Sequence, residues 1–426
     1  MVPSKATARE EILSEINQNK DSYITFLQNL IHAASPNPPG DTRESAQTVI
    51  DYLKHHGITP SVIAPLTHAP NVVVDFEGIQ GPGDRVVLNG HLDTYPVENP
   101  DSWERDPYSG YNDGKNIHGR GGVDMKAGTA ASIIAFTLLK KRSGQLKGSV
   151  ALAAVSDEET GGQWGTRYLL ENFGDKWKGD CAVNGEPGGL SSIRFGEKGT
   201  LRITFTIITK GANGAYAGLV SRGANIIASQ LIVKLLDIEQ IKPHPPEELR
   251  KHFESDLARQ VADDIMGTGA ANLLVKPTLN IGVIHGGVKV NTVPEQCVFE
   301  ADIRLPIGLD ASYVLNFINN ILKDFPEASY KIQTAASNRA NWCTADHPFA
   351  RAIATCAAET TGTEPVMLTG LGGTDCKFYR YAGVPTYVYG PSPKGMGGQG
   401  EAVSIDEFLA VVKTHTLAVF DHLTAP

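Results

Sequence analysis

Hydrophobic positions along the chain follow two periods, one typical of helices and one typical of buried strands. From about residue 8 to residue 33, apolar side chains recur every three or four positions, and the run ends at the breaker Ser35-Pro36-Asn37-Pro38-Pro39-Gly40. A second helix is predicted over about 42–56. Short apolar runs predict strands at 72–74, 86–88 and 150–155, with a helix over about 125–141 before the last of them. Strands that alternate with helices indicate an α/β fold with a mixed, largely parallel sheet.

The pattern changes in the middle of the chain. Between about residues 201 and 305, strands with alternating polarity surround helices such as 225–241, which indicates a smaller α+β insert. The α/β alternation then resumes, with helices near 311–325, 348–361 and 406–423. We therefore predict one discontinuous domain formed by residues 1–198 and 312–426, interrupted by a second domain at 199–311.

Length and composition narrow the class of protein. A chain of 426 residues suggests two or three domains, and two is the simplest expectation. The net charge of -9, without a run of lysine or arginine, argues against a nucleic-acid or anionic-membrane partner. The five scattered cysteines lack C-x-x-C spacing and are interpreted as reduced thiols, and neither a signal peptide nor a membrane span is predicted. A cytoplasmic location is the expectation.

Candidate chemistry begins at Asn89-Gly90-His91-Leu92-Asp93-Thr94, directly after a predicted strand. Residues two apart on a strand face the same way, so His91 and Asp93 share one face. A carboxylate beside a histidine is the pairing that orients an imidazole toward a metal. Capping of a turn at the strand end is the alternative interpretation of the same two residues.

Three further acidic sites follow in the first α/β part. Asp124 comes at the end of a glycine-rich turn that opens a helix, and this turn lacks the spacing of a phosphate-binding loop. Glu158 and Glu159 follow a predicted strand on a segment expected to be extended, so that one can bind a metal while its neighbour reaches the metal's water. Glu186 ends another strand. Ligands gather at the carboxyl ends of strands in such sheets, so we expect these side chains to converge with His91 rather than form separate solvated turns.

These motifs carry a family resemblance. H-x-D, G-R-G-x-x-D-M-K, D-E-E and G-E-P, in this order, resemble the co-catalytic zinc amidohydrolases that include acetylornithine deacetylase, succinyl-diaminopimelate desuccinylase, aminoacylase and glutamate carboxypeptidase. Further segments resemble the family's lid and active-site loops, namely 286–294, 302–304 and 372–375. The resemblance implies a zinc-peptidase-like catalytic domain at 1–198 and 312–426, and a lid and dimerisation domain at 199–311 that forms a homodimer.

The resemblance also implies a role for each residue of the site. Asp124 would bridge two zinc ions, His91 and Glu186 would complete one zinc site, and Glu159 would serve the second. Asp93 would orient His91, and Glu158 would be the general base that deprotonates the metal's water. Zinc lowers the pKa of bound water to about 7, which makes such a base effective.

Two histidines of the family pattern are absent. Matching Glu401 to the glutamate near the family's C-terminus puts Gly397 where a zinc-binding histidine belongs, and matching Asp406-Glu407 puts Val403 there. The second zinc would keep Asp124 and Glu159, with water, Glu401 or Gln399 as a substitute. We therefore expect one firmly bound Zn²⁺ and a second that is weak or absent, with Co²⁺ or Mn²⁺ as substitutes.

The second absent histidine belongs to the lid, where the family places a donor to the tetrahedral oxyanion. Asn213 is the best match for it and Tyr216 is another. An asparagine amide still donates a hydrogen bond. Asn291 and Arg304 are expected to contact a substrate carboxylate, because arginine grips carboxylates with two donors, although Arg304 also fits a structural role.

Three functional hypotheses follow. The first is a metal-dependent amidohydrolase, a deacylase that cleaves an N-acyl amino acid or a small peptide-like amide. The second is a repurposed member that catalyses condensation, cyclisation or amide formation on a carboxylate-bearing metabolite, because the second metal site is incomplete. The third is an inactive metal-binding scaffold, which the retention of Glu158, a residue that is not a ligand, argues against. The sequence does not identify the substrate.

Overall fold

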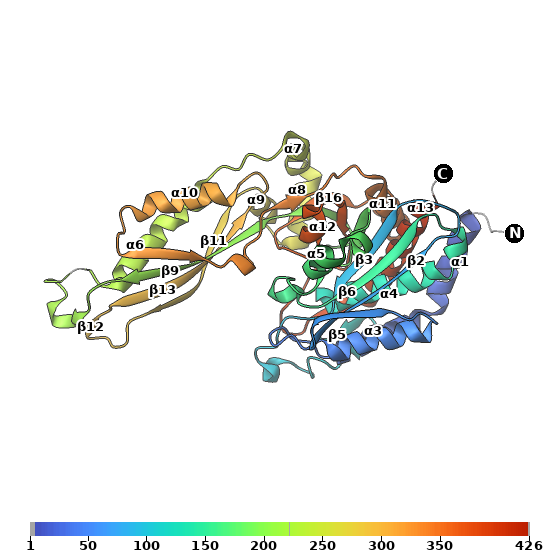
Figure 1. The fold of residues 1–426 in the computed structure, drawn as a ribbon, viewed down its shortest axis with the longest axis horizontal. Coiled ribbons are helices and arrows are strands. Elements are labelled where there is room, and N and C mark those ends of the chain that lie inside the picture. Colours follow the sequence, from blue (N-terminus) through green and yellow to red (C-terminus); the bar gives the residue numbers. More distant parts are fainter. Residues whose placement is uncertain (1–4, 221, 425–426) are drawn as a thin grey trace.

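The chain folds into two units, a larger one around a nine-stranded sheet and a smaller one around a four-stranded sheet (Figure 1). The computed structural model describes residues 5–220 and 222–424. In the larger sheet the strand order is β1-β2-β6-β3-β7-β17-β8-β15, and β16 also pairs with β8. The bounds are Ser61–Leu66 (β1), Ala69–Glu77 (β2), Arg85–His91 (β3), Ser149–Val155 (β6), Cys181–Asn184 (β7), Ser192–Glu197 (β8), Asn341–Trp342 (β15), Val366–Gly370 (β16) and Thr386–Val388 (β17).

The centre of the larger sheet is parallel, which confirms the predicted fold class. Strand β3 pairs in parallel with both β6 and β7, and β17 pairs in parallel with β7, whereas β1, β2 and β15 pair antiparallel. Every residue of β6 is buried, as expected for a strand with helices on both faces. Alternate residues of β3 face opposite layers, since Val86 and Leu88 pack in one core cluster and Val87 packs in another.

Helices cover both faces of this sheet. Helices α4 and α13 lie on one face with α1, α2, α3 and α11, whereas α5 and α12 lie on the other. The bounds are Lys5–Gln18 (α1), Lys20–His32 (α2), Arg43–His55 (α3), Ala127–Lys140 (α4), Thr166–Trp177 (α5), Pro348–Thr361 (α11), Cys376–Tyr381 (α12) and Ile405–Leu423 (α13). The helix predicted over 8–33 is two helices divided at Asn19, because asparagine in this polar stretch favours a helix end.

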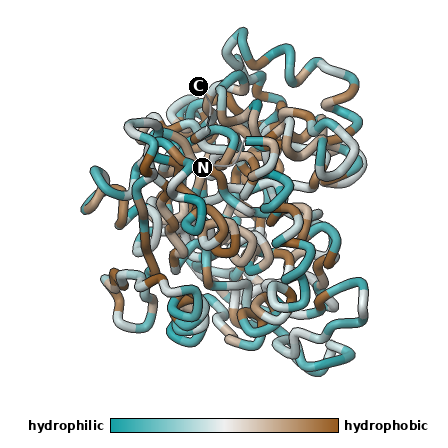
Figure 2. Tube along the Cα trace, turned by 90° about the vertical axis from the view of Figure 1, so that its right-hand side faces the viewer, coloured by the Kyte–Doolittle hydropathy of each residue, from teal (hydrophilic) through white to brown (hydrophobic). Residues whose placement is uncertain are grey.

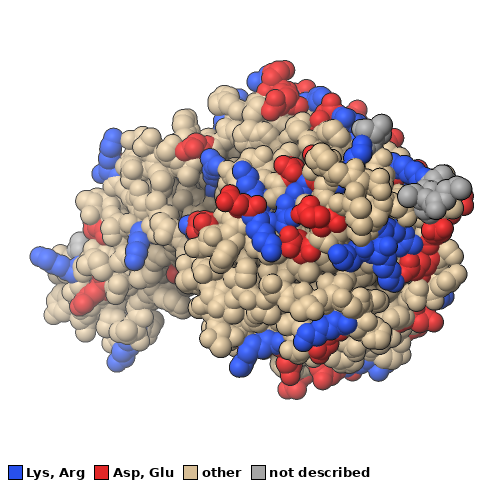
Figure 3. Space-filling model, turned by 45° about the vertical axis from the view of Figure 1, so that its right-hand side comes forward, with Lys and Arg blue, Asp and Glu red and all other residues tan. Residues whose placement is uncertain are grey.

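Among the residues that the structure describes, one segment is long and apolar enough to cross a membrane by length and composition alone. It runs from Gly122 to Lys140 and includes α4, and 94% of its most apolar window is buried inside the fold. It is therefore the central core helix of the larger unit. On the face drawn in Figure 3, lysine and arginine side chains are interspersed with aspartate and glutamate, and in Figure 2 the outer loops are largely hydrophilic.

The smaller unit has strand order β11-β13-β9-β14, with helices α6 and α10 packed on its core. Its bounds are Gly199–Ile208 (β9), Ala224–Leu235 (α6), Thr278–Gly286 (β11), Gln296–Leu305 (β13), Ala311–Leu322 (α10) and Ala328–Ile332 (β14). The predicted boundary at residue 312 is too early. Val314 and Ile318 of α10 pack in the smaller core, and β14 pairs with β9, so the chain returns to the larger unit only after β14.

Three short helices join the two units. They span Glu247–Glu254 (α7), Asp256–Met266 (α8) and Ala270–Leu274 (α9). Ala258 of α8 and Leu274 of α9 share a small hydrophobic cluster with Leu368 of β16, so this part of the predicted insert packs against the larger unit. Ile265 and Met266 of α8 also line a cavity between the units.

Candidate active site

The predicted chemical residues lie at the carboxyl ends of three neighbouring parallel strands. His91 is the last residue of β3, and Glu186 follows the end of β7. Glu158 and Glu159 lie on a short 3-10 turn, Glu158–Thr160 (η4), that follows β6. Asp124 comes from the irregular turn Gly122–Lys126 (η2) that leads into α4. The order β6-β3-β7 brings these side chains to one edge of the sheet.

The distances between the side chains fit a shared cation. His91 Nε2 lies 3.2 Å from Asp124 Oδ1 and 3.4 Å from Glu186 Oε1. Ligand atoms around a tetrahedral zinc with its usual bond lengths are about 3.3 Å apart. Two groups of three each have one donor atom per residue within 4.8 Å, namely His91 with Asp124 and Glu159, and His91 with Glu158 and Glu186. The structure therefore brings all four predicted ligands together.

The pKa shifts of the clustered carboxylates also indicate a cation site. Burial raises the pKa of Glu158 and Glu159, and neighbouring carboxylates raise that of Glu159 further. Burial and the charge of Asp124 raise the pKa of Glu186 to about 7. Burial alone would lower the pKa of His91, but its bonds to Asp124 and Glu186 hold it well above the usual value. Several buried carboxylates this close together can all be ionised only if a nearby positive charge offsets their mutual repulsion and their loss of hydration.

A buried carboxylate oxygen without a hydrogen-bond partner also indicates a cation site. Glu159 Oε1 is buried and has no hydrogen-bond partner within residues 5–220 and 222–424. A buried carboxylate oxygen without a partner is costly in a folded protein unless it binds an ion. The donor set of one imidazole and several carboxylates suits zinc, and the residues present therefore fit a divalent metal.

Asp93 holds two parts of the site together. Its backbone carbonyl lies 2.9 Å from His91 Nδ1, while its carboxylate lies 3.6 Å from the same nitrogen. The carboxylate accepts hydrogen bonds from the backbone N–H groups of Glu158 and Glu159 and from Asn37 Nδ2. The two glutamates were expected on an extended segment, but these bonds hold them on a turn that begins after Asp157, whose φ is 76°.

The segment with the absent histidine lies beside Asp124. Gly397 offers only its backbone, whose oxygen accepts a hydrogen bond from Arg120. Glu401 is buried next to the Asp124 turn. Its carboxylate accepts a hydrogen bond from Arg120 Nη1 at 2.6 Å and further hydrogen bonds from the backbone N–H groups of Val123 and Asp124. It therefore orients the Asp124 turn and does not supply a metal donor. Gln399, the other suggested substitute, is exposed.

A cavity of about 650 Å³ opens beside the four predicted ligands, between the two units. Its wall includes Asp124, Glu158, Glu159 and Glu186 together with side chains that the sequence did not single out. Arg194 Nε is buried there without a hydrogen-bond partner among the described residues. The basic residues of the wall are Arg194, Lys198, Arg202, Arg304, Arg339 and Lys377.

Lys377 is a residue of the site that the sequence did not predict, and it lies next to the proposed general base. Its ammonium lies 3.8 Å from Glu158 Oε1, donates to the carbonyl of Thr374 and is buried. It lowers the pKa of Glu158, against the larger effect of burial. Lys377 lies two residues after segment 372–375, which resembles an active-site loop of the family. A lysine within an otherwise buried helix was the feature that could have identified it.

The three predicted lid residues lie in different places. Arg304 reaches the cavity, where it also donates to Asp302 at 2.9 Å. Asn213, in strand β10 (Ala212–Asn213), caps a turn by accepting from Ala215 N, and Asn291 precedes the paired strand β12 (Thr292–Val293). Strand β12 lies at the far tip of the smaller unit, away from β3 and β6 (Figure 1). Tyr216, the other candidate donor, lies three residues from Asn213 and is exposed. Within one chain, Asn213 and Asn291 therefore do not line the cavity.

Comparisons with known proteins bear on the whole chain. The model of a family described as peptidase family M20/M25/M40 matches residues 87–421. A probable succinyl-diaminopimelate desuccinylase of Staphylococcus aureus is 24% identical over 85% of this chain and 90% of its own length. A formyl-aminopyrimidine deformylase of Halalkalibacterium halodurans is 26% identical over 58% of this chain and 57% of its own. An M20 family metallo-carboxypeptidase structure from Sulfolobus solfataricus superposes with a TM-score of 0.80 at 20% identity, covering 95% of this chain and 99% of that one.

Proposed function

The chain belongs to peptidase family M20/M25/M40, and from that premise we propose that it hydrolyses an N-acyl amino acid or a small peptide-like amide with zinc as its cofactor. The observation that carries the proposal is the convergence of His91 with Asp124, Glu158, Glu159 and Glu186, the last four of which line one cavity. The relatives named for desuccinylation and deformylation act on amides, which supports this class of reaction.

The proposed roles follow from position and charge. His91, Asp124 and Glu186 would hold the firmly bound ion, and Glu159 with Asp124 would serve a second position. When bound, zinc would acidify water and polarise the carbonyl of the amide. Glu158 accepts the proton of that water on its carboxylate and passes it to the leaving amine. Lys377 favours the ionised form of Glu158, and Asp93 orients both His91 and the Glu158 turn.

The cavity wall indicates a substrate that carries a carboxylate. Arg194, Arg304 and Arg339 line the same space as the predicted ligands. Guanidinium groups bind carboxylates with two parallel hydrogen bonds, and a cavity of this size suits a small metabolite. Arg194, with its unpartnered buried Nε, is the strongest candidate for this contact beside the predicted Arg304.

We further propose that the two metal positions are unequal. The first has one imidazole and two carboxylates close enough for a common ion. The second lacks an imidazole of its own, because Gly397 stands where the family pattern has histidine and Glu401 is bound to Arg120. A lost ligand lowers affinity, so the second ion is expected to bind weakly or not at all.

The unequal site also supports a second candidate function. A repurposed enzyme that forms an amide or closes a ring on a carboxylate-bearing metabolite would need one firm ion and the basic wall, but not a complete second metal position. The buried Arg120–Glu401 pair, which takes up the space of a substitute ligand, is the observation that favours it. Product analysis separates it from hydrolysis, because only hydrolysis releases a free amine and a free acid from one amide.

A homodimer through the smaller unit is part of the proposal. Strand β11 is an edge strand of the smaller sheet, and its Val283 and Ile284 are exposed. Helix α6 contacts β11, and its Ile226 and Val233 are also exposed. An exposed edge with apolar side chains is a ready surface for a second copy. Light scattering tests this, with Ile284→Lys expected to give a monomer, and a monomeric natural protein would contradict it.

The test of the main proposal is Glu158→Gln. Turnover of N-acyl amino acids and dipeptides should fall about 10²- to 10⁴-fold, as is typical for loss of a general base, while the metal content per chain stays unchanged. Glu171→Gln, the same change at an exposed position of α5, should keep full activity. Unchanged turnover in the Glu158 variant would contradict the mechanism. Metal analysis of the natural protein gives the stoichiometry, and two tightly held ions would contradict the unequal site.

A further inference from the structure

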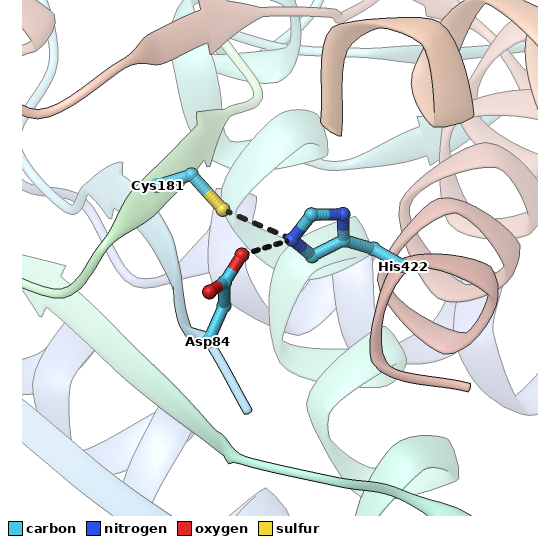
Figure 4. A group of neighbouring side chains, drawn as sticks. All are labelled: Asp84, Cys181 and His422. Carbon is cyan, nitrogen blue, oxygen red and sulfur yellow. Dashed lines mark hydrogen bonds and ion pairs between the residues drawn. The ribbon is translucent and has the colours of Figure 1, made fainter. Parts of the chain in front are cut away.

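Three side chains of different chemistry meet at the opposite end of the strands that carry the catalytic residues (Figure 4). Asp84 directly precedes β3, and Cys181 is the first residue of β7. These strands are adjacent and parallel, with Val86 paired to Cys181. His422 comes from the last turn of α13. Asp84 and His91 are separated by the length of β3, about 23 Å at 3.3 Å per residue, so the cluster is distinct from the active site.

The two partners of His422 contact the same ring nitrogen. Its Nε2 lies 2.7 Å from Asp84 Oδ2 and 3.9 Å from Cys181 Sγ. Figure 4 shows the carboxylate and the sulfur both directed at that nitrogen. In a catalytic cysteine–histidine–aspartate relay the acid would contact Nδ1 and leave Nε2 for the thiol, so this arrangement is not a relay. Three donors of different elements directed at one point are typical of a metal site instead.

The separations are close to those around zinc. With usual bonds to nitrogen, oxygen and sulfur, a tetrahedral zinc holds its nitrogen and sulfur ligands about 3.6 Å apart, and its nitrogen and oxygen ligands about 3.3 Å apart. The observed nitrogen–sulfur distance is about 0.3 Å longer than this reference, and the observed nitrogen–oxygen distance is about 0.6 Å shorter. The Asp84 side chain is 49% exposed and free to make the larger adjustment, whereas Cys181 is buried and the His422 side chain is 8% exposed.

The surroundings favour a cation. The last turn of α13 presents backbone carbonyls, the partly negative end of the helix, to this region. The ring of Phe349 packs against the ring of His422, with 5.1 Å between centroids, and limits its rotation. The half-exposed Asp84 leaves a path from solvent and a position for water as a fourth ligand.

We propose that Asp84, Cys181 and His422 form a second, sulfur-containing metal site that binds a divalent cation of the zinc type. One imidazole, one thiolate and one carboxylate suit Zn²⁺, Co²⁺ or Cd²⁺ rather than the harder Mg²⁺ or Ca²⁺. Binding exchanges the thiol proton of Cys181 for the metal, and the proton passes to solvent. The bound ion cross-links the end of α13 to β3 and β7, the strands that also carry His91 and Glu186.

Metal binding at this site should depend on pH, because the Cys181 thiol must lose its proton. Burial, together with the carboxylates of Asp84 and Asp180, raises the pKa of the Cys181 thiol well above its ordinary value. His347 also lies near the cluster, with its ring centroid 6.4 Å from that of His422, and Arg351 is close to His347 in turn. Because the metal must displace the thiol proton, affinity should rise with pH.

The test is a cobalt titration of the metal-stripped, reduced full-length chain, followed by absorption. A cobalt–thiolate bond gives charge-transfer absorption in the near ultraviolet. The predicted ligands of the active site contain no sulfur, and within residues 5–220 and 222–424 the proposed site is the one cluster of possible metal ligands that contains a cysteine, so the band reports on this site. The natural protein and Cys297→Ser, which changes a buried cysteine of the smaller unit, should both show the band. Cys181→Ser should lose it, while His91→Ala should keep it.

A second variant keeps the test decisive if Cys181→Ser does not fold. Asp84→Asn changes a half-exposed side chain and should lower the cobalt affinity read from the band by roughly tenfold or more. Zinc should displace the cobalt and abolish the band. The absence of a band in the natural protein, its retention in Cys181→Ser, or an unchanged affinity in Asp84→Asn would each overturn the proposal.

Discussion

Arg120 Nη1 donates to Glu401 Oε2 across 2.6 Å, and both side chains are at most 5% exposed. The pair joins the turn that carries Asp124 to the segment before α13, since Glu401 also accepts the N–H groups of Val123 and Asp124. This contact takes up the carboxylate closest in sequence to the absent histidine. The Asp124 turn is therefore supported by a buried ion pair on the side where the family pattern has a ligand.

Removal of one partner should cost much more than removal of both. Arg120→Met leaves Glu401 charged and buried, so we expect a loss of about 3–5 kcal/mol in the free energy of unfolding and a lower metal content. The double variant Arg120→Met/Glu401→Gln should recover part of that loss. Urea unfolding checks this, with Arg167→Met, which breaks the exposed pair with Glu171, as a control that should lose less than about 1 kcal/mol. Equal losses in the single and double variants would contradict the coupling.

Lys377 should set the acid limit of activity. Its positive charge favours the ionised form of Glu158, so Lys377→Met raises the pKa of that carboxyl beyond the effect of burial. A general base with a higher pKa is ionised only at higher pH, so the acid limb of the kcat/KM profile should move to higher pH. Lys377→Arg should restore part of the shift, and the exposed Lys178→Met should leave the profile unchanged. A lower rate with an unmoved profile would indicate a merely structural role.

The sequence predicted the ligands because each lies close to the end of a strand or the start of a helix. His91, Asp124, Glu159 and Glu186 all lie within a few residues of a strand end or helix start, and parallel strands bring such positions to one edge. The conformation of the Glu158–Glu159 segment was not predictable in the same way. It depends on Asp93, 65 residues earlier in the chain, whose carboxylate accepts both N–H groups.

Residues and elements placed by long-range packing escaped the sequence. Lys377 meets Glu158 only because α12 packs on the face of the sheet opposite α4, a choice that local periodicity does not record. Helix α10 has the same apolar period in either unit, and its place in the smaller core depends on which sheet β14 joins. Asn213 matched a motif, but its pairing with Thr292 in a short two-stranded sheet places it beside β12 at the far tip of the smaller unit.

His415 should make the stability depend on pH. It is buried between Ser132 and the carbonyl of Tyr389, and burial lowers its pKa to about 4. In the unfolded chain the imidazole has its ordinary pKa of about 6.5. The contribution of neutral, buried His415 to the free energy of unfolding is therefore complete above about pH 6.5 and is lost as the pH falls toward 4. Between pH 7 and pH 5, the natural protein should lose about 2 kcal/mol more than His415→Gln. Urea midpoints at both values check this, and His32→Gln, an exposed histidine, should behave like the natural protein.

Arg304 offers a test of the substrate class. It lines the cavity from the smaller unit and keeps its orientation through Asp302, so it is placed to bind a substrate carboxylate. Arg304→Ala should raise KM for an N-acyl amino acid roughly 10- to 100-fold, the value of a charged hydrogen bond, with a smaller effect on kcat.

The matched control is a change in the substrate. An N-acyl amino acid amide lacks the carboxylate, so the natural enzyme should bind it as weakly as Arg304→Ala binds the acid, and the variant should lose nothing further. Asn213→Ala, at the far tip, should leave KM unchanged in a monomer. An equal rise in KM for the acid and its amide would mean that Arg304 shapes the cavity rather than binds a carboxylate, and the substrate's charge would then have to be met by Arg194 or Arg339.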